Sequence, residues 1–390
     1  QTAITGNNLA RALSELGHTT RAVRVCLDAL DIRERMGAEF PIAYSHTTLA
    51  LIYNNGLRPE DVWPEAALAV AYFRRLQNAR GLGLSLLQFG ESLRRLSTSG
   101  KTLADNPLEL QDAAEQILQE GLGIFTDPNN LASHETIRRI EAHIELGCLF
   151  RDRARPKLTP DFARRERRNR EAMRHLNQAI RLADEGQFPQ LRLDAQVNLA
   201  WTHYFVGEIE SAETALNKAE SMLPAASIFH EGQPPPSSDG AEGYVFQQLS
   251  KMWALRGRIA FETFIKRRSI IEETREAPDR SLIHQQVSAD PEAARFLSEA
   301  AEAFTISLAC SQLFSPRSGA LVTAYDTLYG YLKEFNVVEM TDFYRYQRQA
   351  KETYRVDEIK IENLADVEIF LRQSFGDYSQ NEGDLAQEGT

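Results

Sequence analysis

The stretch LAWTHYFVGEIESAETALNKAESMLP, residues 199–224, constrains the fold more than any other part of the chain. Small residues recur in it at Ala200, Gly207, Ala212 and Ala219, and bulky apolar residues lie between them. On both sides of Gly207 the apolar positions follow the spacing of a helix face, and glycine commonly ends a helix at its carboxyl end. The pattern therefore predicts two antiparallel helices, joined by a tight turn, that approach closely where the alanines meet.

Similar patterns recur along the chain. The best second copy lies near the amino terminus, where Ala10, Gly17 and Ala22 hold the small-residue places. Looser copies lie at residues 49–73, 89–118, 146–179, 253–300 and 328–354. A unit that repeats at intervals of helix-pair length predicts a stacked array, in which each unit packs on its neighbours.

The repeated unit resembles the tetratricopeptide repeat (TPR), a helix-turn-helix of about 34 residues with the pattern W-x2-L-G-x2-Y, then A-x3-F, then P. In the stretch quoted above, Leu199 and Ala200 take the L-G places and His203 takes the tyrosine place. Gln196 departs from the pattern at the tryptophan place. The resemblance covers residues 4–355 and implies an all-α fold, a right-handed TPR-like α-solenoid of about seven helix pairs.

Interruptions of the pattern indicate how the chain is organised. Insertions are expected between the two helices of several repeats, a short one at residues 54–62 and others at 97–111, 151–170 and 261–291. The expected order is an N-terminal array of about five repeats at 1–225, a Pro/Ser-rich connector at 226–245, TPR-like repeats at 246–355, a capping helix at 356–375 and a disordered acidic tail at 376–390. The capping helix is expected because the end of a solenoid otherwise exposes apolar surface.

The composition bounds the kind of protein. The chain has 390 residues and a formal net charge of −11, which disfavours a dedicated nucleic-acid binder because phosphate contacts need Lys and Arg. Cys26, Cys148 and Cys310 are far apart and form no metal-binding or disulfide pattern. No apolar run is long enough to span a bilayer. We therefore expect a cytoplasmic protein and, because the chain begins at Gln1 without methionine, part of a longer one.

Sequence motifs for catalysis or cofactor binding are incomplete. SGKT at 99–102 matches the end of a phosphate-binding loop, but Arg95 stands where that loop needs a glycine. HETIRRIEAHIE at 134–145 lacks the HExxH spacing that places two metal ligands on one helix face. No GxSxG nucleophile motif is present. We therefore expect no enzymatic activity, no metal site and no cofactor.

The TPR resemblance also implies a binding surface. In TPR arrays the first helix of each pair lines a concave groove, and groove positions recur every three or four residues along that helix. Carried onto this chain, those positions are Asn8, Arg11, Glu15, Thr47, Leu51, Asn54, Gln88, Glu91, Arg94, Glu145, Arg151, Asp194, Asn198, Trp201, Tyr204 and Arg258. Trp201 is the expected anchor, because a large aromatic ring at a groove position suits a binding hot spot. The alternative for Trp201 is burial under an inserted loop.

The segment 151–174 is the strongest local departure from the acidic composition, with ten Lys or Arg against four Asp or Glu. Two interpretations stay open. In the first, the segment recognises nucleic acid or another anionic ligand through Arg164, Arg165, Arg167, Arg168 and Arg170. In the second, it is a solvated insertion whose arginine stems cover the next helix.

These observations predict a non-catalytic protein- or peptide-binding TPR module. The interrupted repeats are similar to the TPR sensor or scaffold regions of bacterial multidomain signal-transduction proteins. That resemblance implies a role in signalling or regulation, with a protein or peptide in the groove and a fused or associated effector or NTPase domain. Nucleic-acid or anion recognition through the Arg-rich segment is the alternative function. No membrane partner is expected.

Overall fold

The computed structural model describes residues 2–15, 18–55, 59–98, 106–156, 158–224, 228–233, 243–273, 287, 289–314 and 337–356. The chain forms two compact units, Gln1–Met222 and Leu223–Thr390. All regular secondary structure in the described residues is helical.

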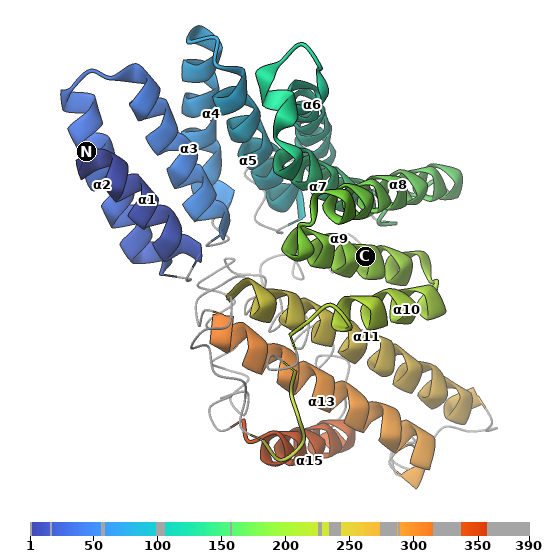
Figure 1. The fold of residues 1–390 in the computed structure, drawn as a ribbon. Helices are drawn as coiled ribbons and strands as arrows, with labels where there is room; N and C mark the ends of the chain where they lie inside the picture. The colour runs from blue at the N-terminus through green and yellow to red at the C-terminus, as the bar shows by residue number, and fades with distance from the viewer. Residues whose placement is uncertain are drawn as a thin grey trace, which may run out of the picture. The chain divides into compact units, whose positions relative to one another are not determined.

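The N-terminal unit is a row of helices: α1 (Thr2–Glu15), α2 (Thr19–Arg35), α3 (Glu39–Asn55), α4 (Pro59–Arg75), α5 (Ala79–Thr98), α6 (Pro107–Thr126), the short 3₁₀ helix η1 (Leu131–His134), α7 (Thr136–Arg153), α8 (Phe162–Gly186), α9 (Pro189–Val206) and α10 (Ile209–Glu220). Each α-helix packs on the next, and α1, α3, α5, α7 and α9 also pack on one another in that order (Figure 1). The surface formed by these five helices is called the odd-helix face below.

The row of odd-numbered helices bends. Arg11 lies on α1 and Glu141 on α7, yet the charge of Arg11 acts on the Glu141 carboxylate. Packed helices are about 8–10 Å apart, so in a straight row the first and fourth odd-numbered helices would be roughly 25–30 Å apart. An interaction between these two side chains therefore requires the row to curve.

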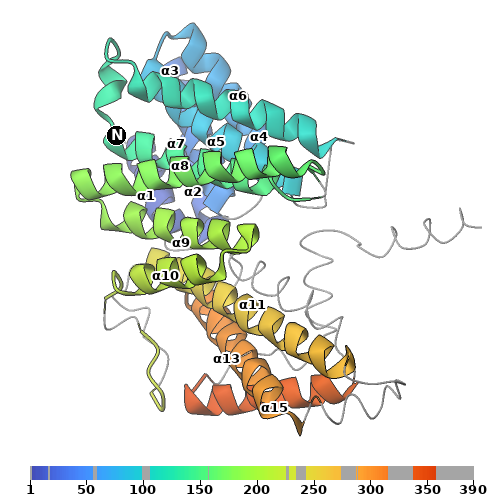
Figure 2. The ribbon, with the colours of Figure 1, turned by 90° about the vertical axis from the view of Figure 1, so that its right-hand side faces the viewer.

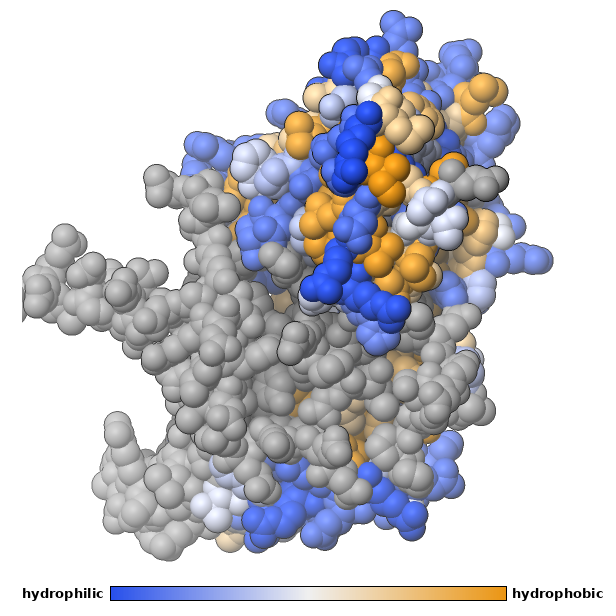
Figure 3. Space-filling view, turned by 90° about the vertical axis from the view of Figure 1, so that its left-hand side faces the viewer, coloured by the Kyte–Doolittle hydropathy of each residue, from blue (hydrophilic) through white to orange (hydrophobic). Residues whose placement is uncertain are grey.

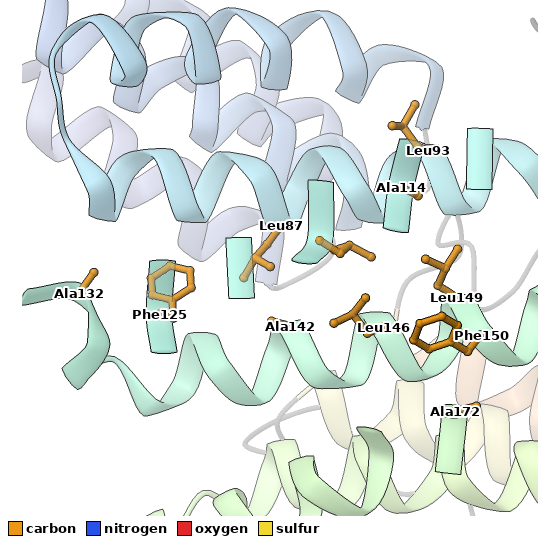
Figure 4. Packing of buried hydrophobic residues seen from close by; sticks show 11 residues of the cluster. Leu87, Leu93, Ala114, Phe125, Ala132, Ala142, Leu146, Leu149, Phe150 and Ala172 are labelled. Carbon is orange, nitrogen blue, oxygen red and sulfur yellow. The ribbon is translucent and has the colours of Figure 1, made fainter. Parts of the chain in front are cut away.

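Small residues at the helix contacts allow this close packing, as the sequence predicts. Ala200, Ala212 and Ala219 are all completely buried. A Cβ atom on Gly90 would lie 2.5 Å from Leu118 Cγ of the neighbouring helix. Leu118 belongs to a layered apolar core between α5, α6, α7 and α8 (Figure 4).

The structure corrects the predicted bounds of the insertions, which are shorter than the sequence suggested. Within 54–62, α4 begins already at Pro59, and within 97–111, α6 begins at Pro107, where Asn106 caps its first turn. Within 151–170, the side chain of Asp161 accepts a hydrogen bond from Arg164 N and starts α8 at Phe162. Most of the Arg-rich segment is therefore helix. Within 261–291, α11 continues to Glu273.

The C-terminal unit contains α11 (Gly243–Glu273), α13 (Pro291–Phe314) and α15 (Val337–Thr353). Helix α13 packs on both α11 and α15. Phe261 and Phe304 are fully buried in this unit, and Phe304 fills the space that a side chain on Gly257 would need. Several predicted elements lie outside the described residues. They are most of the connector 226–245, the first helix of the seventh predicted repeat, the capping helix beyond residue 356 and the acidic tail.

The end of the row formed by α1 and α2 retains exposed apolar side chains. Ile4, Leu9, Leu27 and Met36 are all exposed there. Hydrophobic and hydrophilic residues are interspersed on this side of the molecule (Figure 3). None of the described helices has the length and hydropathy needed to cross a membrane.

We expect Gly147→Ala to destabilise the protein. The added Cβ atom would lie 2.6 Å from Leu176 Cγ, so α7 and α8 would have to move apart, and overpacking of this kind typically costs about 1–3 kcal/mol. The control is Gly123→Ala on α6, where nothing lies within 4 Å of the new Cβ atom. Alanine is the better helix former, so the control should keep or increase the free energy of unfolding. Chemical denaturation measures both, and equal stabilities would contradict the packing account.

Candidate binding face

Buried polar side chains join neighbouring helices of the odd-helix face. Between α1 and α3, Asn7 Nδ2 donates to Thr48 Oγ1 at 3.1 Å. Between α3 and α5, the hydroxyls of Thr47 and Ser85 lie 2.8 Å apart. Buried polar groups are costly when they lose their partners, so these bonds fix how each helix sits against the next.

The same arrangement continues along the row. Asn54 Nδ2 on α3 donates to Gln88 Oε1 on α5 at 2.8 Å. Between α7 and α9, an Nη atom of Arg151 donates to Asn198 Oδ1 at 3.1 Å. Polar contacts thus connect each odd-numbered helix to the next one, apart from α5 and α7, which are connected by charged groups.

An ion-pair cluster joins α5 to α7. Arg94 Nε lies 3.0 Å from Glu145 Oε2, and an Nη atom of Arg94 lies 2.9 Å from Asp152 Oδ2. Asp152 also pairs with Arg151 at 3.1 Å. Burial alone would raise the pKa of Asp152, but the charges of Arg151, Arg94 and Arg155 outweigh burial and hold that pKa at about 2. Asp152 is therefore ionised at neutral pH.

Carboxylates from three successive odd-numbered helices lie near one another beside this cluster. Burial raises the pKa of Glu91 on α5 to about 7, against the opposing charges of Arg95 and Arg94, and the charges of Glu145 and Asp194 raise it further. The carboxylate of Glu91 lies 2.5 Å from Arg95. With a pKa near 7, Glu91 can gain or lose a proton when the charge of a neighbouring group changes.

An aromatic cluster lies on α9. The ring centroid of Trp201 is 5.9 Å from that of Tyr204 and 5.7 Å from that of Phe205. Arg155 lies over the Phe205 ring at 5.5 Å, and Phe205 is 38% exposed. Aromatic and arginine side chains are enriched at binding hot spots. Phe205 and Arg155 are not among the positions predicted from the sequence, although Phe205 follows Trp201 at the four-residue spacing of one helix face.

The structure places the predicted groove residues at different depths. Exposed positions are Asn8, Arg11 and Glu15. Half-buried positions are Leu51, Gln88, Glu91, Glu145, Arg151, Asp194, Trp201 and Arg258. Buried positions are Thr47, Asn54, Arg94, Asn198 and Tyr204. The structure brings the members on α5, α7 and α9 together, whereas Arg258 lies on α11 of the other unit. A contact with a partner remains a prediction for all of them.

The predicted anion-binding arginines divide into two groups on α8. Arg164, Arg167 and Arg170 are exposed. Arg165 instead donates to the carbonyl oxygen of Pro160 at 3.2 Å. Arg168 pairs with Glu171 at 3.1 Å and lies over the ring of Phe150. The Arg168 side chain therefore lies against α7, and the Arg165 side chain lies against the residues that precede α8.

Two histidines that sequence spacing did not relate lie together between α7 and α8. Nδ1 of His143 is 2.9 Å from Nδ1 of His175. Burial lowers the pKa of both rings to about 4, and the charge of Arg174 acts in the same direction on each. One ring therefore donates to the other while both are neutral. In the described part of the chain, no group of three or more His, Cys, Asp or Glu side chains is arranged to hold a metal ion.

We expect the His143–His175 pair to make the fold sensitive to mild acid. The folded-state pKa of each ring lies below its ordinary value of 6.5, so the unfolded chain binds protons first as the pH falls. The stabilising contribution is complete above pH 6.5 and is lost as the pH falls towards 4. Replacing both histidines by glutamine should flatten the decline in the free energy of unfolding over this window. Identical slopes in wild type and variant would contradict the assignment.

No protein-family model matches the chain, and no curated protein matches it either. Among solved structures, the chain is similar to two crystal structures of a putative kinesin light chain from Podosopora anserina, which has nearly identical TPR-like repeats. A single-residue variant is 16% identical with a TM-score of 0.39, and the match covers 56% of this chain and 92% of that chain. The other is 15% identical with a TM-score of 0.39, covering 57% and 96%. The chain's own packed helix pairs and buried alanines make the N-terminal unit an all-α solenoid of TPR-like repeats.

Proposed function

We propose that the chain is a non-catalytic scaffold that binds a protein or peptide segment along its odd-helix face. The observation that carries this proposal is the polar and charged surface shared by α5, α7 and α9. Gln88, Glu91, Glu145 and Asp194 there are half-buried, so each still exposes part of its side chain to solvent. A row of such groups offers hydrogen bonds and charges to an extended segment.

Preorganisation favours binding at this surface. The Glu145 carboxylate is held by Arg94, and the Gln88 amide oxygen by Asn54. Side chains that are already fixed lose little conformational entropy when a ligand binds. At α9, Trp201 and Phe205 add apolar contact area beside the charged groups. Together these groups suit a peptide with polar or charged residues followed by an apolar anchor.

The wider role follows from the TPR resemblance. We propose that partner binding makes the chain a cytoplasmic sensor or scaffold of a larger signalling or regulatory system, bacterial by that resemblance. In such a system, a fused or associated effector or NTPase domain would carry the activity that binding regulates. This part of the proposal depends on the repeat pattern and on the resemblance alone.

Peptides selected from a random library on the full chain provide a test of the odd-helix face. We expect Glu91→Gln and Phe205→Ala each to weaken a selected peptide by about tenfold, because a charge partner or an anchor is lost. Matched controls on even-numbered helices are Glu213→Gln on α10 and Leu68→Ala on α4, both exposed, which should change the dissociation constant by less than about twofold. Loss of binding in the controls alone would refute the proposed location.

A further inference from the structure

Helix α8 carries a stripe of exposed arginines on the side away from the core. Arg164, Arg167, Arg170, Arg174 and Arg181 are all exposed. In Figure 2, α8 lies in front of α7 and runs across the side of the N-terminal unit that faces the viewer. Over its whole length α8 has seven arginines and four carboxylates. It is therefore a basic helix on an acidic protein.

The arginines are aligned along the helix axis. A helix turns by about 100° per residue, so Arg167, Arg174 and Arg181, at seven-residue intervals, lie within about 40° of one another. Their distance along the axis is about 21 Å at 1.5 Å per residue. The buried residues of α8, which include Leu176 and Ala179, lie on the opposite side. Arg167, Arg174 and Arg181 thus form a line of positive charge along α8.

Most arginines of the stripe are not paired with a carboxylate in the described ranges, so they can bind a ligand. Arg164, Arg167 and Arg174 form no ion pair with any carboxylate in the described ranges. Arg170 lies 3.3 Å from Glu166, with both side chains more than half exposed. An exposed pair of this kind contributes little free energy, so a competing carboxylate can replace Glu166.

The basic surface is bounded on one side by an acidic helix. Arg168 reaches from α8 to within 3.6 Å of Glu115 on α6, so side chains of the two helices meet at this edge. Helix α6 has four carboxylates and no Lys or Arg. Asp112 and Glu115 of α6 pair with Arg153, and Glu120 pairs with Arg74, so the carboxylates at this edge are largely neutralised by arginines outside the stripe.

We propose that the arginine stripe of α8 docks an acidic α-helix of a partner protein, aligned lengthwise with α8. A second helix can present carboxylates at seven-residue intervals, which matches Arg167, Arg174 and Arg181. Arginine binds carboxylates with two parallel hydrogen bonds, which gives each contact a defined geometry. A nucleic acid fits less well, because its phosphates spread across a wider surface than one helix face. This docking surface is separate from the odd-helix face.

The probe is a fluorescein-labelled, alanine-based peptide of about 20 residues, since shorter helices are marginal in water. Its glutamates repeat every seven residues, with further glutamates three residues after each. A scrambled peptide of the same composition and a single-stranded oligonucleotide of similar charge are the comparisons. Fluorescence anisotropy at low salt with the full chain measures the three dissociation constants. We expect the aligned peptide to bind at least about fivefold tighter than either comparison.

The critical variant is the pair Arg167→Glu and Arg174→Glu, and the matched control is Arg21→Glu with Arg24→Glu, two exposed arginines on α2. Both double variants change the net charge equally. The α8 variant should weaken the aligned peptide by at least about tenfold, and the α2 variant by less than about twofold. Circular dichroism checks whether both variants remain helical.

Three results would overturn the proposal: no binding of the aligned peptide, equal loss in the two double variants, or tighter binding of the oligonucleotide. The last result would assign the stripe to nucleic acid. A peptide selected on the odd-helix face should bind the α8 variant as it binds wild type, so failure at one surface is distinguishable from failure at the other.

Discussion

The close approach of helices at residues with minimal side chains is the constraint on which the rest of the structure depends. Gly90 admits Leu118, and Gly147 admits Leu176, at distances that a Cβ atom would forbid. Because each helix pair is tight, the odd-numbered helices also reach one another. Hydroxyl, amide and guanidinium groups on successive odd-numbered helices then come within hydrogen-bond distance. The polar contacts of the odd-helix face are therefore a consequence of glycine and alanine in the core.

This packing gives the N-terminal unit two surfaces of different chemistry. On the odd-helix face, opposite charges such as Arg94 and Asp152 are paired and largely buried. They therefore fix the positions of side chains and add little net charge to the surface. Replacing one member of such a pair leaves the other charge buried and costs about 3–5 kcal/mol. On α8, the exposed arginines leave the helix positively charged. The first surface suits a segment recognised by shape and fixed hydrogen bonds, and the second suits a partner recognised by charge.

Local patterns predicted the helix pairs, because small-residue spacing and Gly207 act within one or two turns. The contacts of the site were harder to predict, because they join residues far apart in sequence: Arg94 and Asp152 are separated by 58 positions. Thr47 and Asn54 fit a groove position by spacing, yet the neighbouring helix buries them. The start of α8 was missed because a run of arginines suggested a loop, although Asp161 is a capping residue of the usual type.

Site-specific photo-cross-linking of a selected peptide is the most direct measurement of the central claim. A benzophenone side chain replaces Gln88, on α5 of the odd-helix face, or Gln116, an exposed residue on α6. The first site lies on the odd-helix face, and the second lies on an even-numbered helix. The account predicts a covalent adduct with the peptide from position 88 and none above background from position 116. An adduct from position 116 with none from position 88 would contradict it.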